Sequence, residues 1–164
     1  MSIFKIEPLA KVHDLSDKLL YITNPEASKI NETLAAYVST RHAYDEMMLI
    51  KKCYLSDQNN TLNGRQFYDY ELSVTSEESG RFNEFSSCVQ ECVNYLANFG
   101  DHCFQTIASI HTNTDNLHAH ILCNNTDMET GERFNISKAD LYQMREAISD
   151  ILVKHDFEPV KDRD

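Results

Sequence analysis

Hydrophobic positions recur along this chain with two spacings, and these spacings predict its helices and strands. A spacing near 3.6 residues, seen at Phe85, Val89 and Val93, predicts a long helix with one apolar face. Alternating or continuous apolar runs predict strands. The predicted helices span residues 15–24, 42–54, 79–99 and 138–155, the last capped by Ser137. The predicted strands span residues 3–6, 33–39, 66–74, 103–111 and 117–123, with a short extended piece at 131–136.

Two of these strands predict the direction of pairing in the sheet. A linker of five residues, Thr-Asn-Thr-Asp-Asn, separates residues 103–111 from residues 117–123. A link this short suits a hairpin, whose strands are antiparallel. Because strands and helices are mixed along the rest of the chain, we predict an α+β fold. It would consist of a central antiparallel β-sheet with helices packed on its faces.

Composition narrows the class of protein. With 164 residues and 18.9 kDa the chain suits one domain. The formal net charge of −11 argues against a protein that coats DNA non-specifically. The acidity is uneven, since residues 1–54 hold seven basic and seven acidic residues and the excess negative charge lies downstream. No apolar run approaches the roughly 20 residues of a membrane span, so we expect no membrane insertion.

The cysteines and the N-terminus indicate a compartment. The five cysteines are an odd number, and the first residues lack the apolar core of a signal peptide. We therefore expect reduced thiols and a cytoplasmic protein. Cys88 and Cys92 lie four residues apart in the predicted helix and share a face. A metal pair is conceivable there, but small buried hydrophobic residues are the favoured interpretation.

Three of the seven histidines are close together in the predicted hairpin. His118 and His120 are two residues apart on a strand, so their side chains point to the same face. His111 ends the neighbouring strand, and a tight turn would bring it opposite them. Three neutral imidazoles leave the charge of a bound metal uncancelled, which suits an anionic substrate such as a phosphate. The alternative is that these are separate surface and core histidines, but the paired spacing favours a metal site.

The histidine stretch resembles a known family. Residues 110–124, Ile-His-Thr-Asn-Thr-Asp-Asn-Leu-His-Ala-His-Ile-Leu-Cys-Asn, look like the third signature of MobP-like plasmid relaxases in the HUH endonuclease superfamily. Residues 19–26, Leu-Leu-Tyr-Ile-Thr-Asn-Pro-Glu, resemble the first signature. Residues 130–135 and 141–155 resemble the segment that follows the histidines. The resemblance covers nearly the whole chain in the family's order, and it implies one nuclease domain over residues 1–164.

The resemblance implies an activity and roles for particular residues. Members of the family nick one DNA strand at a transfer origin by tyrosine attack, which gives a 5′-phosphotyrosine adduct and a free 3′-OH. The matching tyrosine is Tyr21, and the alternative for it is a core aromatic residue. The implied partners are single-stranded origin DNA and accessory relaxosome proteins. The implied metal ligands are His111, His118 and His120, holding Mg²⁺ or Mn²⁺, although imidazoles also bind Zn²⁺ or Ni²⁺ well.

The same resemblance implies further residue roles, and the sequence departs from the family pattern at several of these positions. The family's His-x-Asp reads His111-Thr-Asn113, so Asn113 would orient a histidine and Asp115 would act as proton acceptor in place of the missing aspartate. Ser73 lies on the strand of the second signature, followed by Val-Thr-Ser-Glu-Glu where the family is more basic. Lys29 stands two residues beyond the usual basic position, and we expect weak DNA contacts from it and from Ser73.

These departures leave three hypotheses for the function. The first is an active relaxase nuclease. The second is a relaxase-fold protein that binds DNA or a partner with impaired chemistry. The third is a metal-dependent phosphodiesterase that uses water as nucleophile. Because chains of the family usually run on past the nuclease domain, we also expect a fragment of a longer protein.

Overall fold

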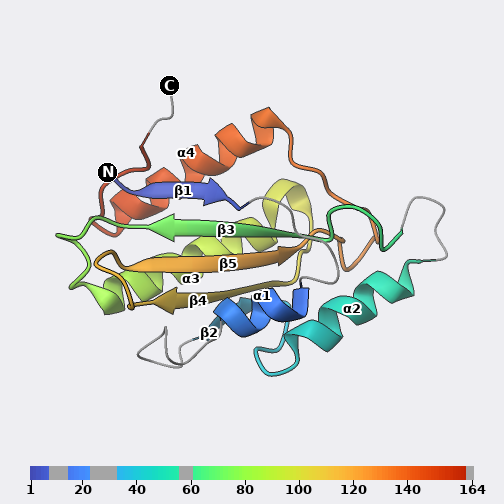
Figure 1. Ribbon diagram of the computed structural model, residues 1–164. Coiled ribbons are helices and arrows are strands. Elements are labelled where there is room, and N and C mark those ends of the chain that lie inside the picture. Colours follow the sequence, from blue (N-terminus) through green and yellow to red (C-terminus); the bar gives the residue numbers. More distant parts are fainter. Residues whose placement is uncertain (8–14, 23–32, 56–60, 162–164) are drawn as a thin grey trace.

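A five-stranded antiparallel sheet lies at the centre of the computed structural model, which describes residues 1–7, 15–22, 33–55 and 61–161 (Figure 1). Its strands lie in the order β1-β3-β5-β4-β2, and each neighbouring pair is antiparallel. The strands are β1 (Ile3–Ile6), β2 (Thr33–Ala36), β3 (Phe67–Ser73), β4 (Thr106–His111) and β5 (His118–Asn124). The helices are α1 (Leu15–Ile22), α2 (Ala43–Cys53), α3 (Phe82–Ala97) and α4 (Lys138–Lys154), with a 3₁₀ turn at Phe99–Asp101.

Helices cover both faces of the sheet, so the predicted α+β architecture is confirmed (Figure 1). Alternate side chains of each strand point to opposite faces. One face packs against α3 and α4, where Tyr70, Ile110 and Ile121 join the larger hydrophobic core. The other face packs against α1 and α2 through a smaller cluster. That cluster consists of Leu15, Leu19, Ala43, Met47, Met48, Phe67, Ile107 and Leu122.

The apolar spacing of α3 explains why this helix packs against the sheet. Its buried positions fall on one stripe, and Cys88 and Cys92 belong to that stripe as the buried small residues that were predicted. Two cores of unequal size result, and the smaller one leaves part of the α1 face of the sheet to polar residues. The described residues include no helix that is both long and apolar enough to cross a bilayer.

The ends of several elements differ from the prediction. The helix predicted from residue 79 begins at Phe82, because residues 75–81 form successive turns, with Ser79 N–H donating to the Ser76 carbonyl. The extended piece predicted at 131–136 amounts to one isolated bridge between Thr126 and Arg133. α4 begins as predicted, because Ser137 and Asp140 form a reciprocal capping box. Residues 23 and 24 of the first predicted helix lie outside the described residues.

Candidate active site

Three histidines meet at one end of the sheet. His118 pairs with His111 across the β4–β5 ladder, and His120 lies two residues along β5 on the same face. The ring centroids are 5.4 Å apart for His111 and His118, 5.3 Å for His118 and His120, and 4.9 Å for His111 and His120. One ring nitrogen from each histidine lies within 4.8 Å of the other two. The hairpin therefore brings together the three residues that the sequence singled out.

The hydrogen bonds of His118 fix which nitrogen faces the cluster. His118 Nδ1 lies 3.0 Å from the carbonyl oxygen of Asn116 and 3.3 Å from Thr114 Oγ1. A carbonyl only accepts, so Nδ1 carries the proton in this bond and Nε2 keeps its lone pair. His111 is fully buried, and His120 is 6% exposed, which holds their rings in place. The site thus offers nitrogen lone pairs from rings with little freedom to move.

A buried carboxylate supports the cluster from β3. Asp69 is 1% exposed, and its Oδ1 lies 3.9 Å from His120 Nδ1. Its Oδ2 lies 3.0 Å from Lys18 Nζ of α1. A carboxylate behind a ligating imidazole typically orients the ring and increases its basicity. Asp69 was not among the predicted site residues, although it is the acidic position between two tyrosines of a largely buried strand.

Tyr21 lies against two of the histidines. Its ring centroid is 5.7 Å from that of His111 and 5.4 Å from that of His120, and both pairs meet edge to face. The side chain is 53% exposed, so its phenol is accessible from solvent. α1 presents Tyr21 in this way because Leu15 and Leu19 anchor the helix to the sheet. Tyr21 is therefore not the core aromatic residue that was its alternative.

The donor set fits a divalent metal ion. Three imidazole nitrogens within 4.8 Å of one another match the ligand number of catalytic metal sites, which keep one position open. The buried Asp69 carboxylate would offset part of the ion's charge without being one of these three. We conclude that His111, His118 and His120 are arranged as a site that can bind a metal ion.

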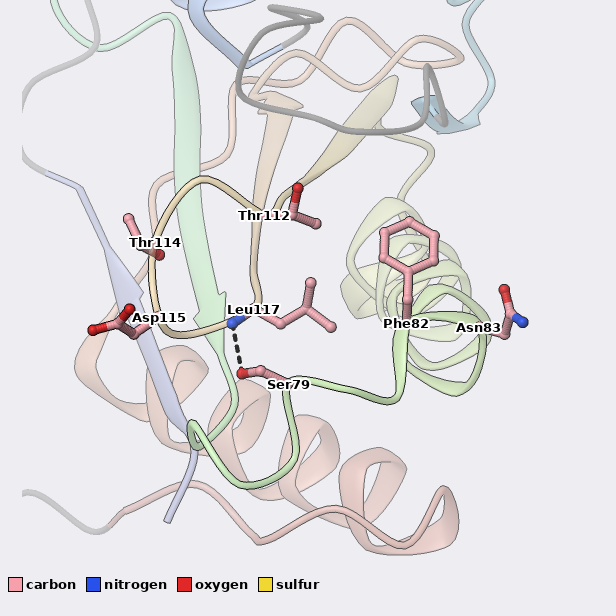
Figure 2. A pocket seen from close by; sticks show the side chains of 7 residues that line it. All are labelled: Ser79, Phe82, Asn83, Thr112, Thr114, Asp115 and Leu117. Carbon is pink, nitrogen blue, oxygen red and sulfur yellow. Dashed lines mark hydrogen bonds between the residues drawn. The ribbon is translucent and has the colours of Figure 1, made fainter.

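Of the other predicted site residues, one adjoins this cluster, two lie in the β4–β5 turn and one lies outside the described residues. Asn113 and Asp115 are exposed in the β4–β5 turn, and Figure 2 shows the Asp115 carboxylate on the outer side of that turn. Their roles in orienting a histidine or accepting a proton stay predictions. Ser73 pairs with His118 in the sheet, is 8% exposed, and donates from Oγ to the Val74 carbonyl. Lys29 lies outside the described residues.

Comparisons with known proteins identify the family of this chain. The family model described as the nuclease domain of MobA/VirD2-like relaxases matches residues 21–157. The protein rlx of Staphylococcus aureus is 40% identical to this chain over 53 residues. That stretch is 32% of this chain and 16% of rlx, so the match covers only a small part of that relative's length.

Solved structures share the fold. The MobM relaxase domain bound to a 22-nucleotide plasmid pMV158 oriT DNA, in an Mn-bound crystal structure at pH 4.6, superposes with a TM-score of 0.69. It is 14% identical, and the match covers 99% of this chain and 90% of that one. A chain from work on vancomycin-resistance transfer in Staphylococcus aureus superposes with a TM-score of 0.62 at 18% identity. That match covers 94% of this chain and 92% of the other.

Proposed function

This chain belongs to the MobA/VirD2-like relaxase family, and on that premise we propose that it nicks one DNA strand at a plasmid transfer origin and transfers the cut strand. The observation that carries the proposal is the contact of Tyr21 with His111 and His120. An accessible phenol beside three convergent imidazoles combines a nucleophile with a site for a phosphate-binding metal. The whole protein's substrate and partners are part of this proposal.

In the proposed reaction Tyr21 forms a new phosphate ester. The phenol oxygen attacks the scissile phosphorus, and the bond from phosphorus to the 3′ oxygen breaks. Tyr21 loses its proton, and the leaving 3′ oxygen gains one to become a hydroxyl. One phosphodiester replaces another, so the strand can be rejoined by the reverse reaction. A phenol has a pKa near 10, so attack at neutral pH needs stabilisation of the negative charge that develops.

The three histidines would hold the metal in this proposal. A divalent cation bound there would act as a Lewis acid on the phosphate oxygens and hold the phosphate in position. We expect Mg²⁺ or Mn²⁺ in use, while imidazole ligands also suit Zn²⁺ or Ni²⁺. Asp69, 3.9 Å from His120 Nδ1, would offset part of the charge of the ion, and Lys18 lies on its other side at 3.0 Å.

The proposed substrate is single-stranded DNA at a transfer origin. The net charge of −11 makes broad electrostatic attraction to DNA unfavourable, so binding depends on contacts at the site and on accessory relaxosome proteins. We further propose that the protein works in the cytoplasm, which agrees with its five free thiols.

A cleavage assay with single-stranded origin DNA and Mn²⁺ tests the proposal. We expect cleavage that leaves a protein-linked 5′ end, and we expect both Tyr21→Phe and His120→Ala to abolish it. Tyr142→Phe is a matched control, because Tyr142 is 66% exposed on α4 and takes no part in the site.

The other two hypotheses give different results in the same assay. Cleavage that survives in Tyr21→Phe but is lost in His120→Ala would indicate a phosphodiesterase that uses water. DNA binding and metal binding without any cleavage would indicate a relaxase-fold binding protein. Asn113, which stands where the family has aspartate, is the departure that favours this last outcome. Either result would overturn the proposed strand transfer.

A further inference from the structure

A hollow of about 410 Å³ lies between the β4–β5 turn and the start of α3 (Figure 2). Figure 2 shows the ring of Phe82 and the side chain of Leu117 on facing sides, with Thr112 near the far end of the turn. Ser79 lies below, where its Oγ accepts a hydrogen bond from the Leu117 N–H at 2.8 Å. The lining residues are Ser79, Phe82, Asn83, Thr112, Thr114, Asp115 and Leu117.

The hollow and the histidine cluster lie at the same end of the β4–β5 hairpin, on opposite faces of the sheet. Thr112 follows His111, and Leu117 precedes His118. Because neighbouring residues of a strand point to opposite faces, the histidines face α1 while Leu117 faces α3. A DNA strand bound at the histidine cluster could therefore reach the hollow by passing around the end of this hairpin.

The chemistry of the lining suits a nucleobase better than a phosphate. None of the seven lining residues is lysine or arginine, and Asp115 adds a negative charge at the rim. Phe82 is half-buried, which leaves part of its aromatic face to the hollow, and Leu117 supplies a second apolar surface. Proteins that bind single strands commonly stack unpaired bases on such aromatic side chains.

We propose that this hollow holds one unpaired base of the bound DNA, stacked on Phe82, close to the nucleotide that is cut. The proposal rests on the proposed function, since it assumes that DNA binds at the histidine cluster. The sugar and phosphate stay outside the hollow. The base fixes the position of the strand relative to Tyr21, so the hollow contributes to the choice of the phosphate that is attacked.

A single tryptophan tests this directly, because the chain contains none. Phe82→Trp is made together with Tyr21→Phe, so that the DNA is bound and not cut, and single-stranded origin DNA is added with Mn²⁺. DNA binding is followed by the anisotropy of a dye on the DNA, and base stacking by tryptophan emission. We expect emission to be quenched in step with binding. One abasic position should abolish the quenching and weaken binding about tenfold.

Two further sets of variants complete the test. Tyr142→Trp in the same background places the tryptophan on exposed α4, and its emission should not respond to DNA. Phe82→Leu keeps apolar bulk and should bind DNA about tenfold more weakly, while Phe82→Tyr keeps the ring and should bind normally. Melting temperatures of these two variants show whether each is folded.

The outcomes separate this proposal from the proposed function. DNA that binds by anisotropy without quenching Phe82→Trp would overturn the base pocket and leave the nuclease proposal intact. Quenching by an accessory protein alone, with no DNA present, would assign the hollow to a protein partner and would also overturn it. A protein that binds no DNA in any variant, even with accessory relaxosome proteins present, would contradict both proposals.

Discussion

Asp69 lies between a cation and an imidazole, 3.0 Å from Lys18 Nζ and 3.9 Å from His120 Nδ1. A buried carboxylate is costly unless charged or polar groups face it. Here the two groups that face it are the cation of α1 and a ring of the candidate metal site. One residue therefore connects the helix that carries Tyr21 to the strand that carries His120.

At the scale of single residues, we expect Asp69→Asn to weaken metal binding. The amide keeps the shape of the side chain but loses the negative charge that offsets the charge of a metal ion held by His120. Mn²⁺ affinity, measured by isothermal titration calorimetry, should fall roughly ten- to hundredfold. Asp150→Asn is the matched control, since it makes the same change at an exposed position on α4, away from the histidines. An unchanged Mn²⁺ affinity in Asp69→Asn would show that Asp69 does not support metal binding.

At the scale of elements, a buried lysine fixes α2 to the ends of two strands. Lys51 is 3% exposed and donates to the Gln66 carbonyl, to Asn125 Oδ1 and to Thr126 Oγ1. Burial, and to a smaller extent the positive charge of Arg133, lowers the pKa of Lys51 to about 7. Hydrogen bonds from one side chain thus attach α2 beside the start of β3 and the end of β5.

The lowered pKa predicts a pH dependence of stability. In the unfolded chain the pKa of lysine is about 10.4, so between pH 7 and pH 10 the unfolded state binds a proton that the folded state lacks. Raising the pH through this range therefore stabilises the fold, by up to about 1.4 kcal/mol per pH unit. Urea denaturation of the wild type and Lys51→Met at pH 7, 8 and 9 measures this. We expect the unfolding free energy of the wild type to increase relative to that of Lys51→Met as the pH rises. A constant difference would show that the Lys51 pKa is not lowered.

The fold was predictable from sequence where the pattern was local. The centres of all five strands and four helices follow from apolar spacing, and Ser137 fixes the start of α4 through its cap. The start of α3 was not predictable, because a long-range bond from the Leu117 N–H to Ser79 Oγ holds the preceding turns. The order β1-β3-β5-β4-β2 depends on pairings between distant segments, which no local pattern contains.

The same distinction applies to the candidate site. The three histidines were predictable, because a strand period of two and a short hairpin bring them together. Tyr21 depended on the family resemblance, since one tyrosine among eight has no local distinguishing pattern. Asp69 was missed because its role depends on β3 lying beside β5. Asp115 and Asn113 are close to the histidines in sequence, but the turn leaves both side chains exposed.

At the scale of the whole molecule, metal binding should increase the thermal stability of the fold. A ligand that binds only the folded state raises the free energy of unfolding, by about 2.7 kcal/mol at a hundred times its Kd. For a domain of this size we expect Mn²⁺ to raise the melting temperature by roughly 5–10 °C relative to excess chelator. His118→Ala, which removes the more exposed ligand, should show no such shift. An equal shift in both proteins would place the metal elsewhere.

The central claim is that Tyr21 and the three histidines form one nucleolytic centre. Mass spectrometry of the protein after reaction with single-stranded origin DNA and Mn²⁺ tests it most directly. After digestion, the peptide that contains Tyr21 should carry a nucleotide joined through a 5′ phosphate, and chelator should prevent its formation. A covalent adduct on another residue, or cleaved DNA with a free 5′ phosphate and an unmodified Tyr21 peptide, would contradict the account.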